Sequence, residues 1–78
     1  MTITILRLPE VLRRRGRSRS AHYLDIQQGL FTQPVAIGAR AVGWPDHEVD
    51  ALNAARGQGD NEIRALVVRL QSFRAGTA

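Results

Sequence analysis

Arginine side chains crowd one short stretch of the chain, residues 13–19, which reads RRRGRSR. A guanidinium group is planar and always charged, and its five N–H donors pair well with phosphate oxygens and with the edge of guanine. The stretch therefore predicts contacts to a polyanion, provided that folded elements present these side chains together. A flexible basic tail and a targeting signal are the alternatives.

The positive charge is concentrated in the first half of the chain. Residues 1–40 contain seven arginines and two acids, a net charge of +5, whereas residues 41–78 contain four arginines and five acids, a net charge of −1. This asymmetry favours one face that meets a polyanion and another that packs or pairs. The absence of lysine has a second explanation in a GC-rich genome, which favours arginine codons.

Length and composition exclude several classes of protein. A chain of 78 residues makes one small domain and leaves no room for a second, catalytic one. It has no cysteine, so no disulfide framework or thiolate metal site is expected, and a reducing cytoplasm is the default compartment. The longest aliphatic run, residues 65–68, is too short to span a bilayer, so we expect no membrane partner. Apolar residues precede the arginines, which is the reverse of the order in a secretory signal. A mitochondrial transit peptide is a weaker alternative than a folded basic motif.

Two short helices are predicted on either side of the middle of the arginine stretch. An early proline and acid, arginines in the last turn and Gly16 as a stop indicate a helix over residues 8–15. Ser18 is a natural N-cap for a second helix over residues 19–28, which Gly29 ends. The brief turn between them is typical of a helix-turn-helix motif, whose second helix enters the DNA major groove with its N-terminal residues.

The remaining pattern predicts strands and a third helix. Alternation over residues 2–5 indicates a short strand that needs a partner later in the chain. Residues 31–37 and 41–44 form a predicted hairpin with Arg40 at its tip. A third helix opens at Asp46, after Trp44 and Pro45, with acids in its first turns.

The last part of the chain has the clearest amphipathic pattern. Asp60 caps a predicted helix over residues 60–75, whose apolar face consists of Ile63, Leu66, Val67, Leu70 and Phe73. Packing of this face on the domain is the favoured interpretation. Self-association through the same five residues is the alternative, because so small a core often gains stability from a partner.

The order and spacing of these pieces resemble a known family. The matching residues are Leu6-Arg7-Leu8-Pro9-Glu10-Val11-Leu12, Ser18-Arg19-Ser20 with Tyr23, Gly29-x-Phe31-x-x-Pro34-Val35-x-x-Gly38, Gly43-Trp44, Glu48-Val49-Asp50-Ala51, Ala55-Arg56 and Asp60-x-Glu62-Ile63-Arg64-Ala65-Leu66-Val67. Together they resemble the AlpA-like regulators of prophages and integrative elements, which are related to excisionase and MerR-like domains. The sequence departs from the family pattern at Arg17 and His22, where the family has apolar residues, at Thr32, a usual proline, and at Leu52, a usual tryptophan.

The resemblance implies a fold and a function. The fold is α+β and mostly helical, a winged helix-turn-helix with a two-stranded wing over residues 1–56 and an added C-terminal amphipathic helix over residues 60–75. Such a protein binds double-stranded DNA near promoters or attachment sites, acts as a transcriptional regulator or as an excisionase that assists an integrase, and is cytoplasmic and nucleoid-associated in a bacterium. Copies on adjacent sites are plausible, since one small module gives limited specificity. The rival hypothesis is a protein-interaction module that docks its basic face on an acidic partner.

Eleven side chains are the candidate DNA contacts: Arg13, Arg14, Arg15, Arg17, Ser18, Arg19, Ser20, His22, Tyr23, Gln27 and Arg40. Arg19 and Ser20 stand at the front of the second helix, where side chains reach base edges, although Arg19 could equally contact phosphate. The arginines before them are candidate phosphate contacts, and those that end the first helix also compensate its dipole. Arg40 could enter a narrow A·T-rich minor groove, with a solvated loop charge as its alternative.

The other candidates have structural alternatives of similar weight. Ser18 caps the helix first and lies near phosphate second. The family resemblance implies a phosphate contact from the Tyr23 hydroxyl, and core packing alone is the other possibility. His22 could contact a base, a phosphate or only solvent, and Gln27 a base, the backbone or only solvent.

An enzymatic function is not expected, and neither is a cofactor or a metal. Asp46, His47, Glu48 and Asp50 are the one cluster of metal-ligand residue types, but neighbours along a helix point in different directions, and acids at a helix start need no metal to explain them. The chain also lacks a phosphate-binding loop of the Walker or dinucleotide kind.

Overall fold

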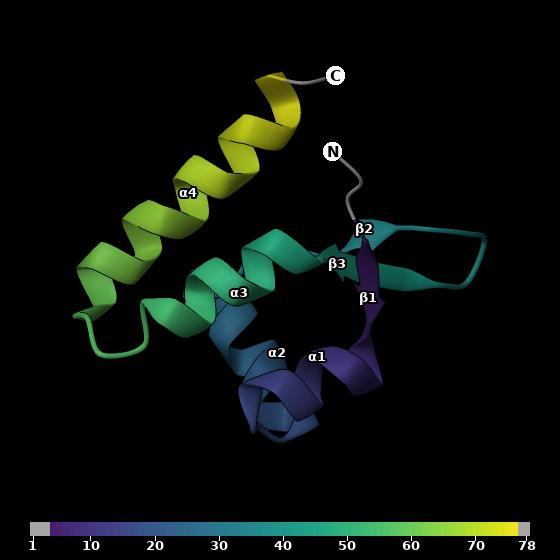
Figure 1. The fold of residues 1–78 in the computed structure, drawn as a ribbon, viewed down its shortest axis with the longest axis horizontal. Helices are drawn as coiled ribbons and strands as arrows, with labels where there is room; N and C mark the ends of the chain where they lie inside the picture. Colours follow the sequence, from purple (N-terminus) through teal and green to yellow (C-terminus); the bar gives the residue numbers. More distant parts are fainter. Residues whose placement is uncertain (1–3, 77–78) are drawn as a thin grey trace.

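The computed structural model describes residues 4–76, which form a winged helix-turn-helix (Figure 1). In chain order the elements are β1 (Ile5–Arg7), α1 (Leu8–Arg15), α2 (Arg19–Gln27), β2 (Val35–Ala36), β3 (Val42–Pro45), α3 (Asp46–Ala54) and α4 (Asp60–Gly76). The helices α1 and α2 make one corner, the β2–β3 hairpin projects to one side, and α4 reverses the chain direction to lie along α3. The predicted fold class, α+β with a wing and an added C-terminal helix, is confirmed.

Local signals set both ends of the turn between α1 and α2. Gly16 adopts a left-handed conformation with φ 66°, and its N–H donates to the carbonyl of Leu12 at 2.8 Å, which ends α1. The hydroxyl of Ser18 accepts from the backbone N–H of Ala21 at 3.2 Å, the N-cap bond that starts α2. These contacts are local in sequence, and the predicted helix-turn-helix is confirmed.

The sheet is antiparallel, with β3 between β1 and β2. The strand β1 lies later than predicted: Ile5 is the one residue of the expected strand 2–5 that it includes, and residues 1–3 lie outside the described part. The strand β2 is shorter than predicted because the segment before it turns inward instead of pairing. Phe31 and Thr32 are buried, and the Thr32 carbonyl accepts from Trp44 Nε1 at 2.9 Å rather than from a neighbouring strand.

Gly43 allows β1 and β3 to approach each other. A Cβ atom at this position would lie 2.6 Å from Cγ2 of Ile5 and 2.7 Å from the carbonyl oxygen of Leu6. Replacing Gly43 by Ala should therefore push β1 away from the sheet and lower the free energy of unfolding by about 1–3 kcal/mol, as overpacking does. Urea unfolding followed by circular dichroism measures the change. Gly57→Ala is the control, because nothing lies within 4 Å of its Cβ position and little change is expected.

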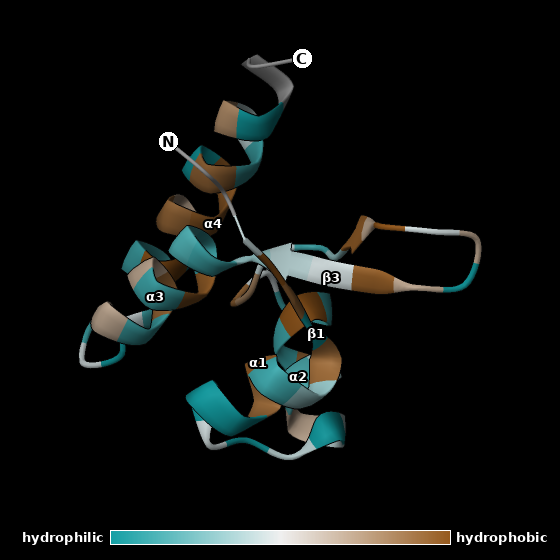
Figure 2. Cartoon of the chain, turned by 45° about the vertical axis from the view of Figure 1, so that its right-hand side comes forward, coloured by the Kyte–Doolittle hydropathy of each residue, from teal (hydrophilic) through white to brown (hydrophobic). Residues whose placement is uncertain are grey.

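The core lies where the helix pairs α1–α2 and α3–α4 meet the sheet. Its buried apolar members are Leu6, Val11, Ile26, Phe31, Trp44, Val49, Leu52 and Val67. The helix α4 closes this core, since Ile63, Leu66 and Leu70 also pack against it, and Figure 2 shows apolar segments of α4 beside α3. Within residues 4–76 no helix is long and apolar enough to cross a bilayer.

This packing supports the favoured interpretation of α4, that its apolar face packs on the domain. Four of the five residues considered for self-association, Ile63, Leu66, Val67 and Leu70, are engaged by the domain's own core. Val67 is buried there, and the other three are partly buried against the core. Phe73 differs, because 64% of its surface is exposed and its position at the end of the helix lies beyond the core.

Candidate nucleic-acid interface

The first residues of α2 have exposed side chains without partners in the described part of the chain. Arg19 and Ser20 are exposed, and within residues 4–76 neither side chain makes a hydrogen bond or an ion pair. The first turn of α2 contains no acid, whereas α1, α3 and α4 each begin with at least one. The positive end of the α2 dipole therefore remains available to an anion.

The two faces of α2 differ in character. His22, Asp25 and Ile26 point into the domain and are buried. Ser20 and Leu24 are exposed on the opposite face, and Gln27 follows at the next turn of the same stripe. Leu24, an apolar side chain outside the predicted set, is also exposed on this outward face.

A polar cluster, formed by Arg15, Arg17, His22 and Asp25, ties α1, the turn and α2 together. Arg15 Nη2 donates to Asp25 Oδ2 at 2.9 Å, and Arg17 Nε lies 2.8 Å from the same oxygen. Arg17 Nη2 also donates to Asp25 Oδ1 at 3.2 Å. One carboxylate therefore binds both the last residue of α1 and the middle of the turn.

Arg15 is a correction to the sequence-based set. Only 7% of its surface is exposed, and its guanidinium carbon lies 4.1 Å above the ring centre of Phe31. The charge can be buried because Asp25 neutralises it and the aromatic face stabilises it. Burial lowers the pKa of Arg15 while Asp25 opposes that shift. Arg15 thus holds α1 against α2 and is buried instead of lying on the surface where a phosphate would bind.

His22 is the second correction, since it is fully buried rather than turned towards DNA or solvent. Its ring lies edge-on to those of Tyr23, Phe31 and Trp44, at centroid distances of 5.5, 5.0 and 4.9 Å. Arg15 Nη1 is 2.7 Å from His22 Nδ1, and because arginine can only donate, the imidazole accepts there and is neutral. Burial, followed by the charge of Arg15, lowers the pKa of His22 to about 4.

Stability should therefore depend on pH through His22. The unfolded chain, with an ordinary histidine pKa near 6.5, takes up a proton more easily than the folded one. The contribution of neutral His22 to the free energy of unfolding should be fully present above pH 6.5. It should be lost as the pH drops towards 4, by roughly 3 kcal/mol in total. Urea unfolding between pH 7 and pH 5 measures the slope before most carboxylates titrate. In His22→Asn, which keeps an acceptor for Arg15, the slope should largely disappear; an unchanged slope would contradict this role.

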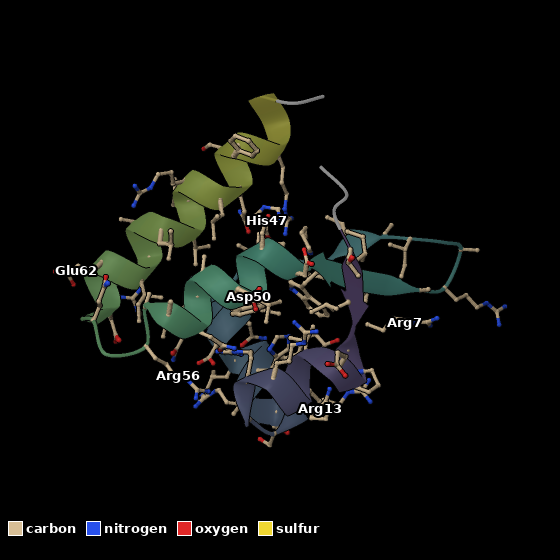
Figure 3. The ribbon with its side chains drawn as sticks, in the orientation of Figure 1. Arg7, Arg13, His47, Asp50, Arg56 and Glu62 are labelled. Atoms are coloured by element: carbon tan, nitrogen blue, oxygen red, sulfur yellow. The ribbon has the colours of Figure 1, made fainter. Side chains whose placement is uncertain are left out.

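Arg13 and Arg14 remain on the surface but have a partner. Both bind Glu10, at 2.6 and 2.9 Å, and these bonds, with Arg13 first, hold the pKa of Glu10 below its usual value. Arg14 also lies 3.7 Å from Asp50. Exposed ion pairs contribute little to stability, so a phosphate could replace Glu10 as the partner of these two arginines. Figure 3 shows Arg13 pointing outward from α1 and Arg7, which the candidate set omitted, pointing outward from β1 towards the wing.

The other predicted contacts are distributed as follows. Ser18 is exposed and uses its hydroxyl for the helix cap. Tyr23 is half-buried and packs on the core, and Gln27 is exposed. Arg40 is exposed at the hairpin tip, where it makes no hydrogen bond or ion pair with any described residue. The hairpin therefore carries a free guanidinium away from the domain.

Three of the four arginines of the second half bind other parts of the fold instead. Arg56 donates to the carbonyl of Arg15, and Arg64 Nε donates to the carbonyl of Gln28 at 2.9 Å. Arg74 binds buried Glu48 through both carboxylate oxygens, which joins α4 to α3. Glu48 is thus occupied by an ion pair, and within residues 4–76 no three ligating side chains gather as a metal site would require.

The architecture defines the class of protein: a helix-turn-helix with a projecting hairpin and exposed arginines around its second helix is a winged helix-turn-helix protein. Residues 4–54 match the family described as Prophage CP4-57 regulatory protein (AlpA), and the chain belongs to this family of prophage regulatory proteins. The resemblance deduced from the sequence is therefore confirmed. The chain is also 43% identical over 51 residues to "Uncharacterized protein ORF88" of Enterobacteria phage P4.

That similarity has limited extent. It covers 65% of this chain and 58% of the phage P4 protein, so the chain matches somewhat more than half of that relative's length. No solved structure gives a significant match. The family assignment thus gives the general class, the prophage regulatory proteins.

Proposed function

We propose that this protein binds specific double-stranded DNA, with α2 in the major groove and Arg40 of the wing in the adjacent minor groove. The observation that carries the proposal is the free front of α2: Arg19 and Ser20 are exposed and without partners among the described residues, while Asp25, the acid of this helix, is turned inward and neutralised. The helix therefore offers donors and no exposed negative charge to the duplex.

The surrounding arginines support the same docking. Arg13 and Arg14 lie at the end of α1, Arg17 lies in the turn, and Arg40 lies at the tip of the hairpin. In a helix-turn-helix complex the first helix crosses the DNA backbone while the second reads bases, so the end of α1 and the turn fall beside phosphates. A wing arginine is attracted by the negative potential of a narrow minor groove.

The biological role that we propose is regulation of transcription, excision of a mobile element together with an integrase, or both. The family assignment supports regulation in a prophage. An excisionase would occupy several adjacent sites beside an attachment site and bend the DNA, whereas a regulator would protect an operator that overlaps a promoter. Several copies on neighbouring sites would also enlarge the specific interface that one small module offers.

Footprinting of the protein on DNA from its own genomic neighbourhood tests the proposal. Arg19→Ala should weaken protection about 5- to 150-fold, the range expected for one bidentate contact to guanine. Arg69→Ala is the matched control: this arginine is exposed on α4, outside the helix-turn-helix and the wing, and its loss should leave protection nearly unchanged. Absence of protection at low salt would overturn DNA binding and favour an acidic protein partner.

A further inference from the structure

Leu24 occupies an unusual place for an apolar side chain. Half of its surface is exposed, it does not belong to the core, and it lies in the middle of the outward face of α2. Ser20 stands one turn before it and Gln27 one turn after it, both exposed. The face that we assign to the major groove therefore has an aliphatic centre between two polar side chains.

We propose that Leu24 reads thymine through its C5-methyl group, an inference that rests on the proposed function. The methyl group of thymine is the one apolar feature that bases present in the major groove, and apolar side chains recognise it by direct contact. A recognition helix that lies in the major groove turns its outward stripe towards the base edges. In that position a leucine has no polar group that needs a hydrogen bond, and its contact with the methyl group removes apolar surface from water.

The neighbours of Leu24 extend this reading. Ser20 and Gln27 are seven residues apart, a rise of about 10 Å along the helix, which corresponds to about three base-pair steps of 3.4 Å. The carboxamide of Gln27 can form two hydrogen bonds with the N6 and N7 atoms of adenine. Adenine pairs with thymine, so Gln27 and Leu24 would both favour A·T base pairs. We therefore infer that α2 recognises a short A·T-containing core, flanked by the position that Arg19 reads.

The buried cluster makes this recognition possible. Asp25 directly follows Leu24, and an exposed carboxylate there would repel the duplex. Arg15 and Arg17 hold that carboxylate inside at 2.9 and 2.8 Å, so the reading face carries no negative charge. The orientation of α2 that buries Asp25 is the same one that turns Leu24 outward, since the two residues are adjacent on the helix.

Replacement of thymine by uracil tests the proposal directly, because uracil pairs identically and lacks only the methyl group. A duplex is first selected by the wild-type protein from a random library, then prepared with thymine or with uracil throughout. Wild type should bind the uracil duplex about fourfold more weakly, the factor that covering one methyl group corresponds to. Leu24→Ala should bind both duplexes equally, and its own loss on the thymine duplex should be of similar size.

Controls separate Leu24 from other effects of uracil. Val68→Ala removes another exposed aliphatic side chain, on α4, and should retain the full preference for thymine. Gln27→Ala should bind more weakly and also retain it. Equal binding of both duplexes by wild type, or a thymine preference that persists in Leu24→Ala, would overturn the proposal while leaving DNA binding intact. No binding of any selected duplex would overturn the proposed function itself, and Leu24 would then be assigned to a protein contact.

Discussion

Asp25→Asn should strongly destabilise the domain. Asparagine has nearly the same shape, but it removes the charge that faces Arg15 at 2.9 Å and Arg17 at 2.8 Å. Arg15 would remain as a buried cation beside the neutral ring of His22. Loss of one partner of a buried pair costs about 3–5 kcal/mol, a large share of the 5–15 kcal/mol that typically holds such a domain together.

Asp50→Asn is the matched control for this measurement. Asp50 makes an ion pair too, but its side chain is 68% exposed and lies 3.7 Å from Arg14, so its loss should change stability by well under 1 kcal/mol. Urea unfolding of both variants at pH 7, followed by circular dichroism, gives the comparison. Equal stability of Asp25→Asn and wild type would show that Arg15 needs no neutralising partner, and the account of the polar cluster would be wrong.

The helix-turn-helix could be predicted from the sequence because its signals are local. Gly16, Ser18 and Gly29 each act on the backbone within four residues, as the observed φ angles and cap bonds show. The hairpin was also predictable, since its strands are close in sequence. The partner of β1 was not, because Leu6 pairs with Trp44 across most of the domain, and nothing near either residue specifies that register.

The candidate site could be predicted only in part, and the errors have one cause. Arg15 and His22 look like surface residues by type, yet they are buried because Asp25 and Phe31 together provide a counter-charge and an aromatic wall. No local pattern reveals such a combination. One clue lay in the resemblance to the AlpA-like pattern, which implies an apolar residue at the position of His22 and so fits its place among three aromatic rings.

The burial of Arg15 also changes which charges can meet DNA. Five of the predicted arginines remain exposed, namely Arg13, Arg14, Arg17, Arg19 and Arg40. If each neutralises one phosphate, the logarithm of affinity should fall with the logarithm of salt with a slope of about −4.5. Between 50 and 200 mM salt, affinity should then drop about 500-fold. Fluorescence anisotropy with a labelled duplex across this range measures the slope.

Single substitutions then distinguish the arginines that meet phosphate from those that do not. Arg40→Ala should make the slope shallower by about 0.9, because it removes one positive charge that displaces counterions from the DNA at the wing. Arg69→Ala removes an exposed charge from α4 and should lower affinity only slightly, with the slope nearly unchanged. If both variants shifted the slope equally, the duplex would be responding to the net charge of the protein rather than to a defined surface. If neither did, the wing would lie away from the DNA, and α2 with the end of α1 would make all of the contacts.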